Sequence, residues 1–324
     1  MKVCVTRKIP GPAVDLLQQA GHEVLAFPED RVQTLEELKQ FVAGADAILS
    51  LLTDKVTGEV MDAAGKQLKI VANYAVGFDN VDLEAAKQRS IFVTNTPGGF
   101  EMAVAEHTIA LMLAVARHIV EGDAYVRAGK YVQWEPELFM GTELFGKTLG
   151  VVGMGRIGLT VAKAAKFGFG MKIAYHAHKQ IADSNEQLGA EFYDDLEKML
   201  EISDVVSLHV PLTAETRHLI SKKELSSMKK SAILINTARG AVVDEMSLCE
   251  ALRERWIAGA GLDVFEDETP IVSETEKVLY GLPNVVLTPH IASATVEART
   301  EMSRMAAQNI IEALAGRTPP NLAK

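Results

Sequence analysis

The sequence "TLGVVGMGRIGLTVAKAAKFG" at residues 148–168 decides the fold of this chain. An apolar run of strand type leads into the glycine pattern GxGxxG, and an alanine-rich helical pattern follows directly. Gly153 allows a tight turn, Gly155 lets backbone amides approach a pyrophosphate, and Gly158 lets the helix pack on the strand. In this strand–turn–helix setting the pattern favours a dinucleotide site over a purely structural loop.

Short apolar runs of strand type alternate with helical patterns on both sides of this turn. Such βαβ alternation predicts parallel sheets covered by helices. The strand-like runs lie at residues 2–6, 23–27, 47–52, 68–77, 91–97, 148–153, 172–176, 205–210, 232–238, 258–264 and 284–289.

Two helical patterns separate the chain into parts. The first, at residues 100–126, reads as one long helix and is too apolar for a helix with one exposed face, so we expect it to be buried between domains or subunits. The last helical pattern follows the final strand-like run. We therefore predict an α/β fold of two doubly wound, Rossmann-like parallel-sheet domains, the first of them discontinuous. Residues 1–99 with 293–324 would form one domain, and residues 100–292 would form the dinucleotide-binding domain.

Composition excludes several classes of protein. The 324 residues are 48% hydrophobic, which is ordinary for a soluble globular chain of about two domains. A net charge of -10 argues against nucleic acid as a partner. Cys4 and Cys249 form neither a disulfide framework nor a CxxC metal site, so a reducing cytosol is the simplest location. The chain has no apolar run of about 18 residues and no signal peptide, so no membrane span is expected.

The stretch "KIAYHAHK" at residues 172–179 bears on the choice of cofactor. A dinucleotide-binding fold usually places an acid here, which holds the ribose hydroxyls and repels the 2′-phosphate of NADP. Ala177 provides no such charge, while His178 and Lys179 can bind a phosphate. The other interpretation is a solvated strand end. We expect NADP(H) to be favoured over NAD(H).

Polar side chains follow three further predicted strands, where a doubly wound sheet places its ligands. Arg239 in "LINTARGAVVDE" can grip a carboxylate through two parallel hydrogen bonds, or form a salt bridge to Asp244. His290 in "NVVLTPHIASAT" can exchange a proton near neutral pH, whereas His107 and His209 are better explained as structural residues. A third strand-like run is followed by the acids Asp263, Glu266, Asp267 and Glu268. One of them could orient a histidine, whereas most would form a solvated turn.

These groups together suit hydride transfer, which needs a nicotinamide site, an anchor for the substrate acid and a proton donor. The chain resembles the D-isomer-specific 2-hydroxy acid dehydrogenase family over essentially its whole length, and within it the glyoxylate/hydroxypyruvate reductases. The motifs that carry the resemblance are "VVGMGRIG", "SLHVPLTAETRHLI", "LINTARGAVVDE", "AGAGLDVFE", "LTPHIASAT" and "YAVGFDNVD". The resemblance implies NAD(P)H-dependent reduction of a small 2-keto acid to the D-2-hydroxy acid.

The resemblance also implies a catalytic trio of Arg239, Glu268 and His290. Arg239 would hold the carboxylate and polarise the keto oxygen, and protonated His290 would give that oxygen a proton. Glu268 would bind and orient the imidazolium. Family members commonly have this glutamate directly before a proline, whereas Thr269 intervenes here. Asp267 is therefore the alternative partner of His290.

The first domain would bind the substrate, with a carboxylate-binding loop and a pocket lining. The resemblance places the loop at Ala75, Val76 and Gly77 and the lining at Leu51, Leu52 and Thr53. A homodimer built on residues 100–126 is also implied, with Trp134 and Met140 reaching the neighbouring cleft. The implied cofactor contacts are Gly153, Gly155, Arg156, Ile157, Gly158, Ala177, His178, Lys179, Val210, Pro211, Thr216, Thr237, Ala238 and Asp263, with Thr108 and Val76 near the nicotinamide and Asp263 on its carboxamide.

Three other functions compete with this interpretation. Phosphite dehydrogenase belongs to the same family, and "RHIVEGDAYVRAGKYVQWEPELF" resembles it, but its substrate requires a lysine where Val76 stands. Formate dehydrogenase has a glutamine where Glu268 stands. The C-terminal-binding transcriptional corepressors are nucleotide-sensing binding proteins of the same fold. They carry extra tails, whereas this chain ends soon after its last helical pattern.

Overall fold

The computed structural model describes residues 1–181, 186–266, 268 and 274–323 of the chain. Two compact units divide it. Unit 1 is Met1–Phe100 with Ala294–Lys324, and unit 2 is Glu101–Ser293. The chain thus leaves unit 1 once and returns to it for the last helix.

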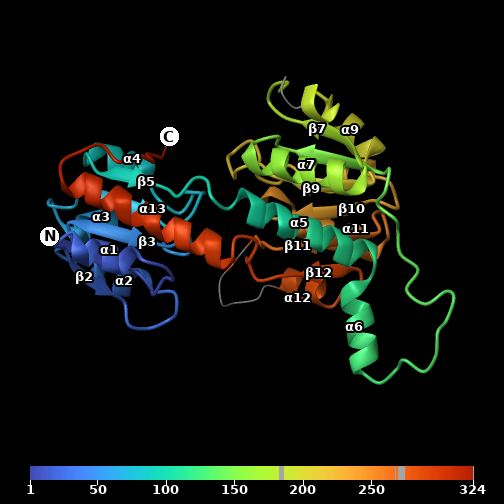
Figure 1. The fold of residues 1–324 in the computed structure, drawn as a ribbon, viewed down its shortest axis with the longest axis horizontal. Coiled ribbons are helices and arrows are strands. Elements are labelled where there is room, and N and C mark those ends of the chain that lie inside the picture. Colours follow the sequence, from blue (N-terminus) through green and yellow to red (C-terminus); the bar gives the residue numbers. More distant parts are fainter. Residues whose placement is uncertain (182–185, 267, 269–273, 324) are drawn as a thin grey trace. The chain divides into compact units, whose positions relative to one another are not determined.

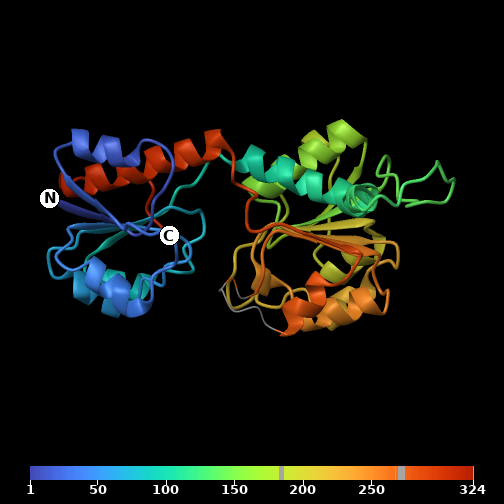
Figure 2. The same ribbon diagram turned by 90° about the horizontal axis from the view of Figure 1, so that it is seen from below.

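Unit 1 is a five-stranded parallel sheet with helices on both faces (Figures 1 and 2). The strand order β2-β1-β3-β4-β5 reverses direction between β1 and β3, as in a doubly wound sheet. The central strands β3 and β4 are wholly buried, which explains why each is apolar up to its last residue, Ser50 or Asn73. The strands are β1 (Lys2–Val5), β2 (Glu23–Ala26), β3 (Ala47–Ser50), β4 (Ile70–Asn73) and β5 (Phe92–Thr94). Helices α1 (Ala13–Gln19) and α13 (Val296–Leu314) cover one face, and α2 (Leu35–Phe41), α3 (Gly58–Ala64) and α4 (Leu83–Gln88) cover the other.

Unit 2 is a seven-stranded parallel sheet that is likewise covered on both faces. Its order β12-β11-β10-β9-β6-β7-β8 reverses between β6 and β9, so both units confirm the predicted doubly wound α/β class. The strands are β6 (Thr148–Val152), β7 (Lys172–His176), β8 (Glu191–Phe192), β9 (Val205–Leu208), β10 (Ile233–Asn236), β11 (Gly259–Leu262) and β12 (Val285–Leu287). Helices α5 (Glu101–Ala116) and α7 (Arg156–Phe169) cover one face, and α9 (Leu196–Ile202), α10 (Lys222–Ser227), α11 (Glu245–Arg253) and α12 (Glu274–Tyr280) the other.

The prediction of one long helix at residues 100–126 is wrong. The structure breaks it into α5 and α6 (Ile119–Arg127), whose axes differ by 64°, and His118 at the break has a left-handed φ of 52°. The amide of Thr142 donates to the carbonyl of Ala116 at 2.8 Å and so replaces the helical partner lost at the break. No glycine or proline marks this position, because the break depends on a contact with chain that returns from residue 142.

Packing within unit 2 accounts for much of the apolar composition of α5. Helix α5 buries Val104, Leu111, Met112 and Val115 in unit 2 itself, against α7 and strands of the sheet. Helix α6 buries no residue. Packing inside one unit is therefore sufficient to explain these apolar residues of α5.

Several predicted strands extend past the observed ones at their carboxyl ends. The run at residues 232–238 shortens to β10, and the run at 284–289 shortens to β12. The residues left over form the loops at the carboxyl edge of the sheet, where ligands of doubly wound folds bind. Strand β8 was missed because two residues are too few to show a period.

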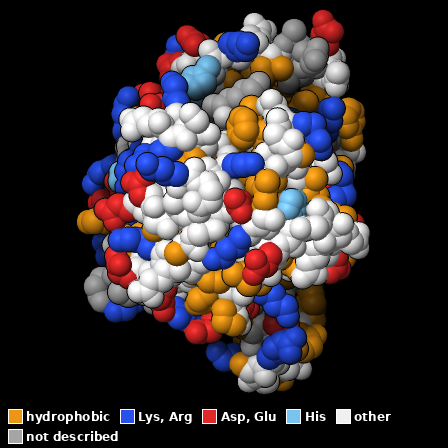
Figure 3. Space-filling model, turned by 90° about the vertical axis from the view of Figure 1, so that its left-hand side faces the viewer, with side chains coloured by type: hydrophobic (Ala, Val, Ile, Leu, Met, Phe, Trp, Pro, Cys, Tyr) orange, Lys and Arg blue, Asp and Glu red, His pale blue; other side chains and the backbone are white. Residues whose placement is uncertain are grey.

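The surface of the molecule carries both signs of charge. Acidic and basic side chains are interspersed over the face shown in Figure 3, with apolar side chains between them. Within the described residues, no single helix is long and apolar enough to cross a membrane, although the bent pair α5 and α6 together has that length and composition.

Candidate active site

Two glycines in the turn between β6 and α7 are needed for the packing of the chain, because a side chain at either would collide with other protein atoms. Gly153 has a φ of 94°, and a Cβ there would lie 2.7 Å from the carbonyl oxygen of His209. A Cβ on Gly158 would collide with the carbonyl of Gly153, so α7 packs too closely for any side chain. Gly155 differs, because a Cβ there would meet no protein atom within 4 Å. This open space at the start of a fourteen-residue helix fits a pyrophosphate on the helix amides.

Other predicted cofactor contacts lie on helices and loops around this turn. Arg156 is largely exposed, and its Nε lies 3.5 Å from a carboxylate oxygen of Glu101. The hydroxyls of Thr108 on α5 and Thr237 after β10 lie 3.0 Å apart, so the structure brings these two predicted residues together. The hydroxyl of Thr216 donates to the carbonyl of Pro211 at 2.6 Å, and so it shapes the loop that also contains Val210.

The loop after β7 is fixed by a hydrogen bond to the buried side chain of Tyr175. The amide of Ile181 donates to the Tyr175 hydroxyl at 2.9 Å, which folds residues 177–181 back over the strand. Ala177 packs partly against the core, whereas His178 and Lys179 are exposed. Both basic side chains are therefore accessible to a ligand.

His290 and Glu268 form a direct pair. The two carboxylate oxygens of Glu268 lie 2.8 and 3.0 Å from Nδ1 of His290. A carboxylate accepts hydrogen bonds, so Nδ1 carries the proton and Nε2 is left for a substrate. Asp267 lies outside the described residues. The structure thus places Glu268 on the histidine although Thr269 follows it.

The other histidine at a strand end suits proton transfer less well. Burial lowers the pKa of His209 to about 3, which keeps its ring neutral near pH 7. Its Nε2 lies 2.8 Å from the hydroxyl of Ser207, and its carbonyl packs against Gly153. His209 therefore supports the glycine turn, in the structural role expected of it.

The loop that carries His290 is fixed by the buried carboxylate of Asp263. That carboxylate accepts from the Thr288 hydroxyl at 2.6 Å and from the amides of Ile291 and Ala292 at 2.8 Å each. The amide of His290 donates to the Asp263 carbonyl at 2.8 Å. Burial alone would raise the pKa of Asp263, but His107, Thr288 and the two amides outweigh it and lower the pKa below its ordinary value. Asp263 therefore organises the loop as an ionised group.

Arg239 occupies a tight turn after β10. The side chain of Asn236 accepts from the amide of Ala238 at 3.0 Å and donates to the carbonyl of Arg239 at 2.8 Å. A Cβ on Gly240 would overlap the backbone of Phe265, so only glycine allows the two segments to touch. This contact brings Arg239 next to the segment that leads to the glutamate of the site.

The backbone carbonyls of the predicted carboxylate-binding loop in unit 1 accept hydrogen bonds from neighbouring residues. Those of Ala75, Val76 and Gly77 accept from the Thr96 amide at 2.9 Å, the Asn95 side chain at 2.7 Å and the Asn73 side chain at 2.9 Å, respectively. The amides of Val76 and Gly77 donate to no residue that the structure describes. Two adjacent free amides form a site that suits an anion.

A second loop in unit 1 carries the predicted pocket residues. The Leu51 amide donates to the buried carboxylate of Asp54 at 2.7 Å, and Asn80 donates to the carbonyl of Leu51 at 3.0 Å. Leu52 is half-buried. The sequence analysis did not predict these supporting polar residues. The one signal in the sequence was Asn73, a polar residue inside the apolar run at residues 68–77, which is buried and donates to Asn80.

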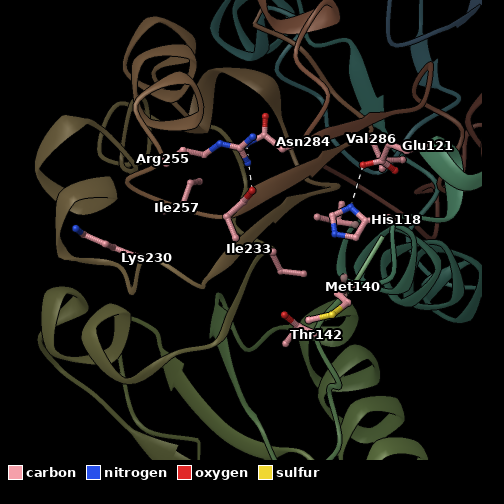
Figure 4. Close-up of a pocket in the computed structure, with 14 residues that line it drawn as sticks. His118, Glu121, Met140, Thr142, Lys230, Ile233, Arg255, Ile257, Asn284 and Val286 are labelled. Atoms are coloured by element: carbon pink, nitrogen blue, oxygen red, sulfur yellow. Dashed lines mark hydrogen bonds and ion pairs between the residues drawn. The ribbon is translucent and has the colours of Figure 1, made fainter. Parts of the chain in front are cut away.

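One cavity in unit 2 lies away from this chemistry. It measures about 350 Å³ and includes Ile233, Ala258 and Asn284, which stand at the amino ends of β10, β11 and β12 (Figure 4). His118 and Glu121 face one another at its edge, 3.2 Å apart. Ligands of doubly wound sheets bind at the opposite, carboxyl ends, so this cavity is not the active site. Among the described residues no group of three His, Cys, Asp or Glu side chains could hold a metal.

Comparison with known proteins places the chain in a family. The family profile described as "D-isomer specific 2-hydroxyacid dehydrogenase, NAD binding domain" matches residues 109–292. A glyoxylate reductase from Thermococcus litoralis is 51% identical over 99% of this chain and 96% of its own. A protein of known crystal structure from Thermus thermophilus has a TM-score of 0.92 and 47% identity, with both chains fully covered. The chain belongs to the D-isomer specific 2-hydroxyacid dehydrogenase family.

A third relative was solved with ligands bound. The NADPH-dependent glyoxylate/hydroxypyruvate reductase from Sinorhizobium meliloti was solved in complex with NADP and malonate. It has a TM-score of 0.85 and 34% identity, over 99% of this chain and 96% of its own. The present protein is accordingly an oxidoreductase that uses a nicotinamide cofactor and a small keto or hydroxy acid.

The glycine turn generates a paired prediction. Gly158→Ala lowers the melting temperature by about 2–10 °C, because its Cβ collides with the turn. Gly155→Ala leaves the melting temperature near that of the wild type but weakens NADPH binding roughly tenfold or more, because its Cβ enters the pyrophosphate space. Calorimetry and fluorescence titration measure the two effects. Unchanged NADPH affinity in Gly155→Ala would show that the pyrophosphate lies elsewhere.

Proposed function

We propose that this enzyme reduces glyoxylate or hydroxypyruvate to the corresponding hydroxy acid, giving the D-isomer where the product is chiral, and uses NADPH in preference to NADH. The pair formed by Glu268 and His290 is the observation that best supports this reaction, since Nδ1 is bound to the carboxylate and Nε2 would be the proton donor. Glyoxylate is the substrate in the names of the Thermococcus and Sinorhizobium relatives, which supports the choice of a small keto acid.

The residues would divide the work as follows. The free amides of Val76 and Gly77 bind the substrate carboxylate, and Arg239 holds the carboxylate and polarises the keto oxygen. The bound nicotinamide supplies a hydride to C2. Nε2 of His290 gives its proton to the keto oxygen, and Glu268 stabilises the imidazolium before that transfer. Hydride and proton together convert the carbonyl group, an aldehyde in glyoxylate and a ketone in hydroxypyruvate, to the alcohol.

Each unit would have one role. Unit 2 binds the dinucleotide, with residues 100–292 as the domain, and unit 1 binds the substrate, with residues 1–99 and 293–324. The match of the NAD-binding profile inside unit 2 supports this assignment. Leu51 and Leu52 would line the substrate pocket, and the remaining contacts expected from the family resemblance would surround the cofactor. Asp263 is the exception, because its carboxylate is fully buried and already accepts from Thr288 and the amides of Ile291 and Ala292.

The preference for NADPH rests on the end of β7. Ala177 provides no charge to repel a 2′-phosphate, and the exposed His178 and Lys179 can bind one. The fold of the loop over Tyr175 keeps both side chains near the strand end. A Sinorhizobium relative that is NADPH-dependent is consistent with this choice.

The arm formed by α6 and the chain up to residue 141 supports a homodimer. Val126, Val132, Trp134 and Met140 are each more than half exposed, and such a run of apolar side chains is typical of an interface. Both cysteines are free and buried, which is consistent with a cytoplasmic location.

A steady-state panel tests the reaction. Among four acids, glyoxylate, hydroxypyruvate, pyruvate and phenylpyruvate, the first two are expected to have the highest kcat/KM. Glycolaldehyde has no carboxylate and is expected not to be reduced.

His290→Ala lowers kcat/KM by about 10²–10⁴-fold with the fold intact by circular dichroism, because the general acid is lost. Full activity of His290→Ala would refute the mechanism. Oxidation of phosphite with NADP⁺ or NAD⁺ in preference to turnover of the keto acids would favour the competing dehydrogenase, and NADPH binding without any turnover would favour a nucleotide sensor.

Ala177→Asp tests the choice of cofactor. The new carboxylate repels the 2′-phosphate and binds the ribose hydroxyls of NADH, so the ratio of kcat/KM for NADPH to that for NADH falls about tenfold or more. Ala177→Asn is the matched control, because it has the same shape without the charge. An unchanged ratio in Ala177→Asp would show that another segment selects the cofactor.

Sedimentation equilibrium tests the homodimer. The wild type is expected to sediment as a dimer at micromolar concentration, and Val126→Asp is expected to weaken association because it places a charge in an apolar interface. Val296→Asp, at a still more exposed position on α13, serves as the control and remains associated. A monomeric wild type would contradict the proposal.

A further inference from the structure

His107 lies in α5 and points at the buried carboxylate that organises the loop of His290. Its Nε2 is 2.9 Å from the hydroxyl oxygen of Thr288 and 3.3 Å from an oxygen of Asp263. The side chain of His107 is 18% exposed and that of Asp263 is fully buried. Helix α5, β11 and the loop after β12 therefore meet at one small polar cluster, and this cluster is composed of His107, Thr288 and Asp263.

The hydrogen bonds within this cluster define where its protons lie. The hydroxyl of Thr288 has a single proton, and it donates that proton to Asp263 at 2.6 Å. The same oxygen must therefore accept from Nε2 of His107. A hydrogen atom on Nε2 also suits the neighbouring carboxylate oxygen. The required chemical feature of His107 is thus one N–H donor at the position of Nε2, whatever the state of its other nitrogen.

The backbone that this cluster holds is strained. His290 has a φ of 54°, a left-handed conformation that residues with a side chain rarely adopt. The conformation persists because Asp263 binds the amides of Ile291 and Ala292 on one side and the hydroxyl of Thr288 on the other. The carboxylate can bind all of these groups only while it stays ionised and correctly oriented. His107, on α5, places a further N–H donor beside that carboxylate and Thr288.

We propose that His107 is a positioning residue for the acid–base catalyst. Its Nε2–H fixes Thr288 and Asp263, which in turn hold the 288–292 loop with His290 at the distance and angle that proton transfer needs. The catalytic consequence rests on the function proposed above, whereas the effect on the loop does not. His107 itself touches neither the substrate nor the transferred proton.

Four variants separate this role from simple packing. His107→Gln keeps an N–H donor at about the reach of Nε2, whereas His107→Asn places its donor one position short, near Nδ1. His107→Leu keeps apolar volume and has no donor. Thr288→Val removes the bridging hydroxyl with little change of shape. His118→Leu is the matched control, because this histidine comes just after the end of α5 but lies at the opposite edge of the sheet, beside the cavity of unit 2.

Hydrogen–deuterium exchange provides the readout that does not depend on activity. In His107→Leu, His107→Asn and Thr288→Val, the amides of Ile291 and Ala292 are expected to exchange about tenfold faster or more than in the wild type, because opening of the loop becomes easier. In His107→Gln and in the control they keep their protection. If these amides keep full protection in His107→Leu, the proposal is overturned, whether or not the protein reduces any keto acid.

Kinetics of the purified full-length enzyme provide the second readout. His107→Leu is expected to lower kcat for glyoxylate about tenfold to a hundredfold through misplacement of His290, with the Kd of NADPH and the melting temperature close to the wild type. His107→Gln restores kcat to within about threefold of the wild type. Equal kcat in the leucine and glutamine variants would mean that His107 acts through packing. A wild type without keto-acid turnover would refute the proposed function and leave the exchange result to decide the role of His107.

Discussion

A single buried carboxylate, that of Asp263, is the constraint on which the geometry of the site depends. A charge without solvent is costly unless donors surround it, and here a hydroxyl and two backbone amides do so, with a histidine alongside. Those donors come from the loop after β12 and from α5. The energetic need to satisfy the carboxylate therefore determines the path of the loop that presents His290.

Glycine at two places determines how closely the other parts approach. Gly158 lets α7 lie against the turn after β6, and Gly240 lets the backbone of Phe265 pass beside Arg239. Both contacts are too close for a Cβ. The consequence is that groups from β6, β10, β11 and β12 gather at the carboxyl edge of one sheet, which is the edge where parallel strands leave polar groups free for ligands.

Much of this arrangement could be predicted from the sequence. The strand-like runs and the glycine motif predicted both sheets, and Arg239 and His290 stood out because each follows an apolar strand. The break at His118 could not be predicted, because local helix propensity continues through it and the partner of Ala116 comes from Thr142. His107 was interpreted as merely structural for the same reason, since its contacts lie far along the chain.

The sequence by itself determined the fold class, the glycine turn and the family, because these follow from local periodicity and from residue types at fixed spacing. Only the tertiary structure decided that Glu268 faces His290, that the amides of Val76 and Gly77 bind no residue in the described part of the chain, and that His107 reaches Asp263. Each of these depends on which hydrogen-bonding groups meet across distant segments. Such pairing is a property of the packed chain, because a donor and acceptor separated by many residues leave no periodic signal in the sequence.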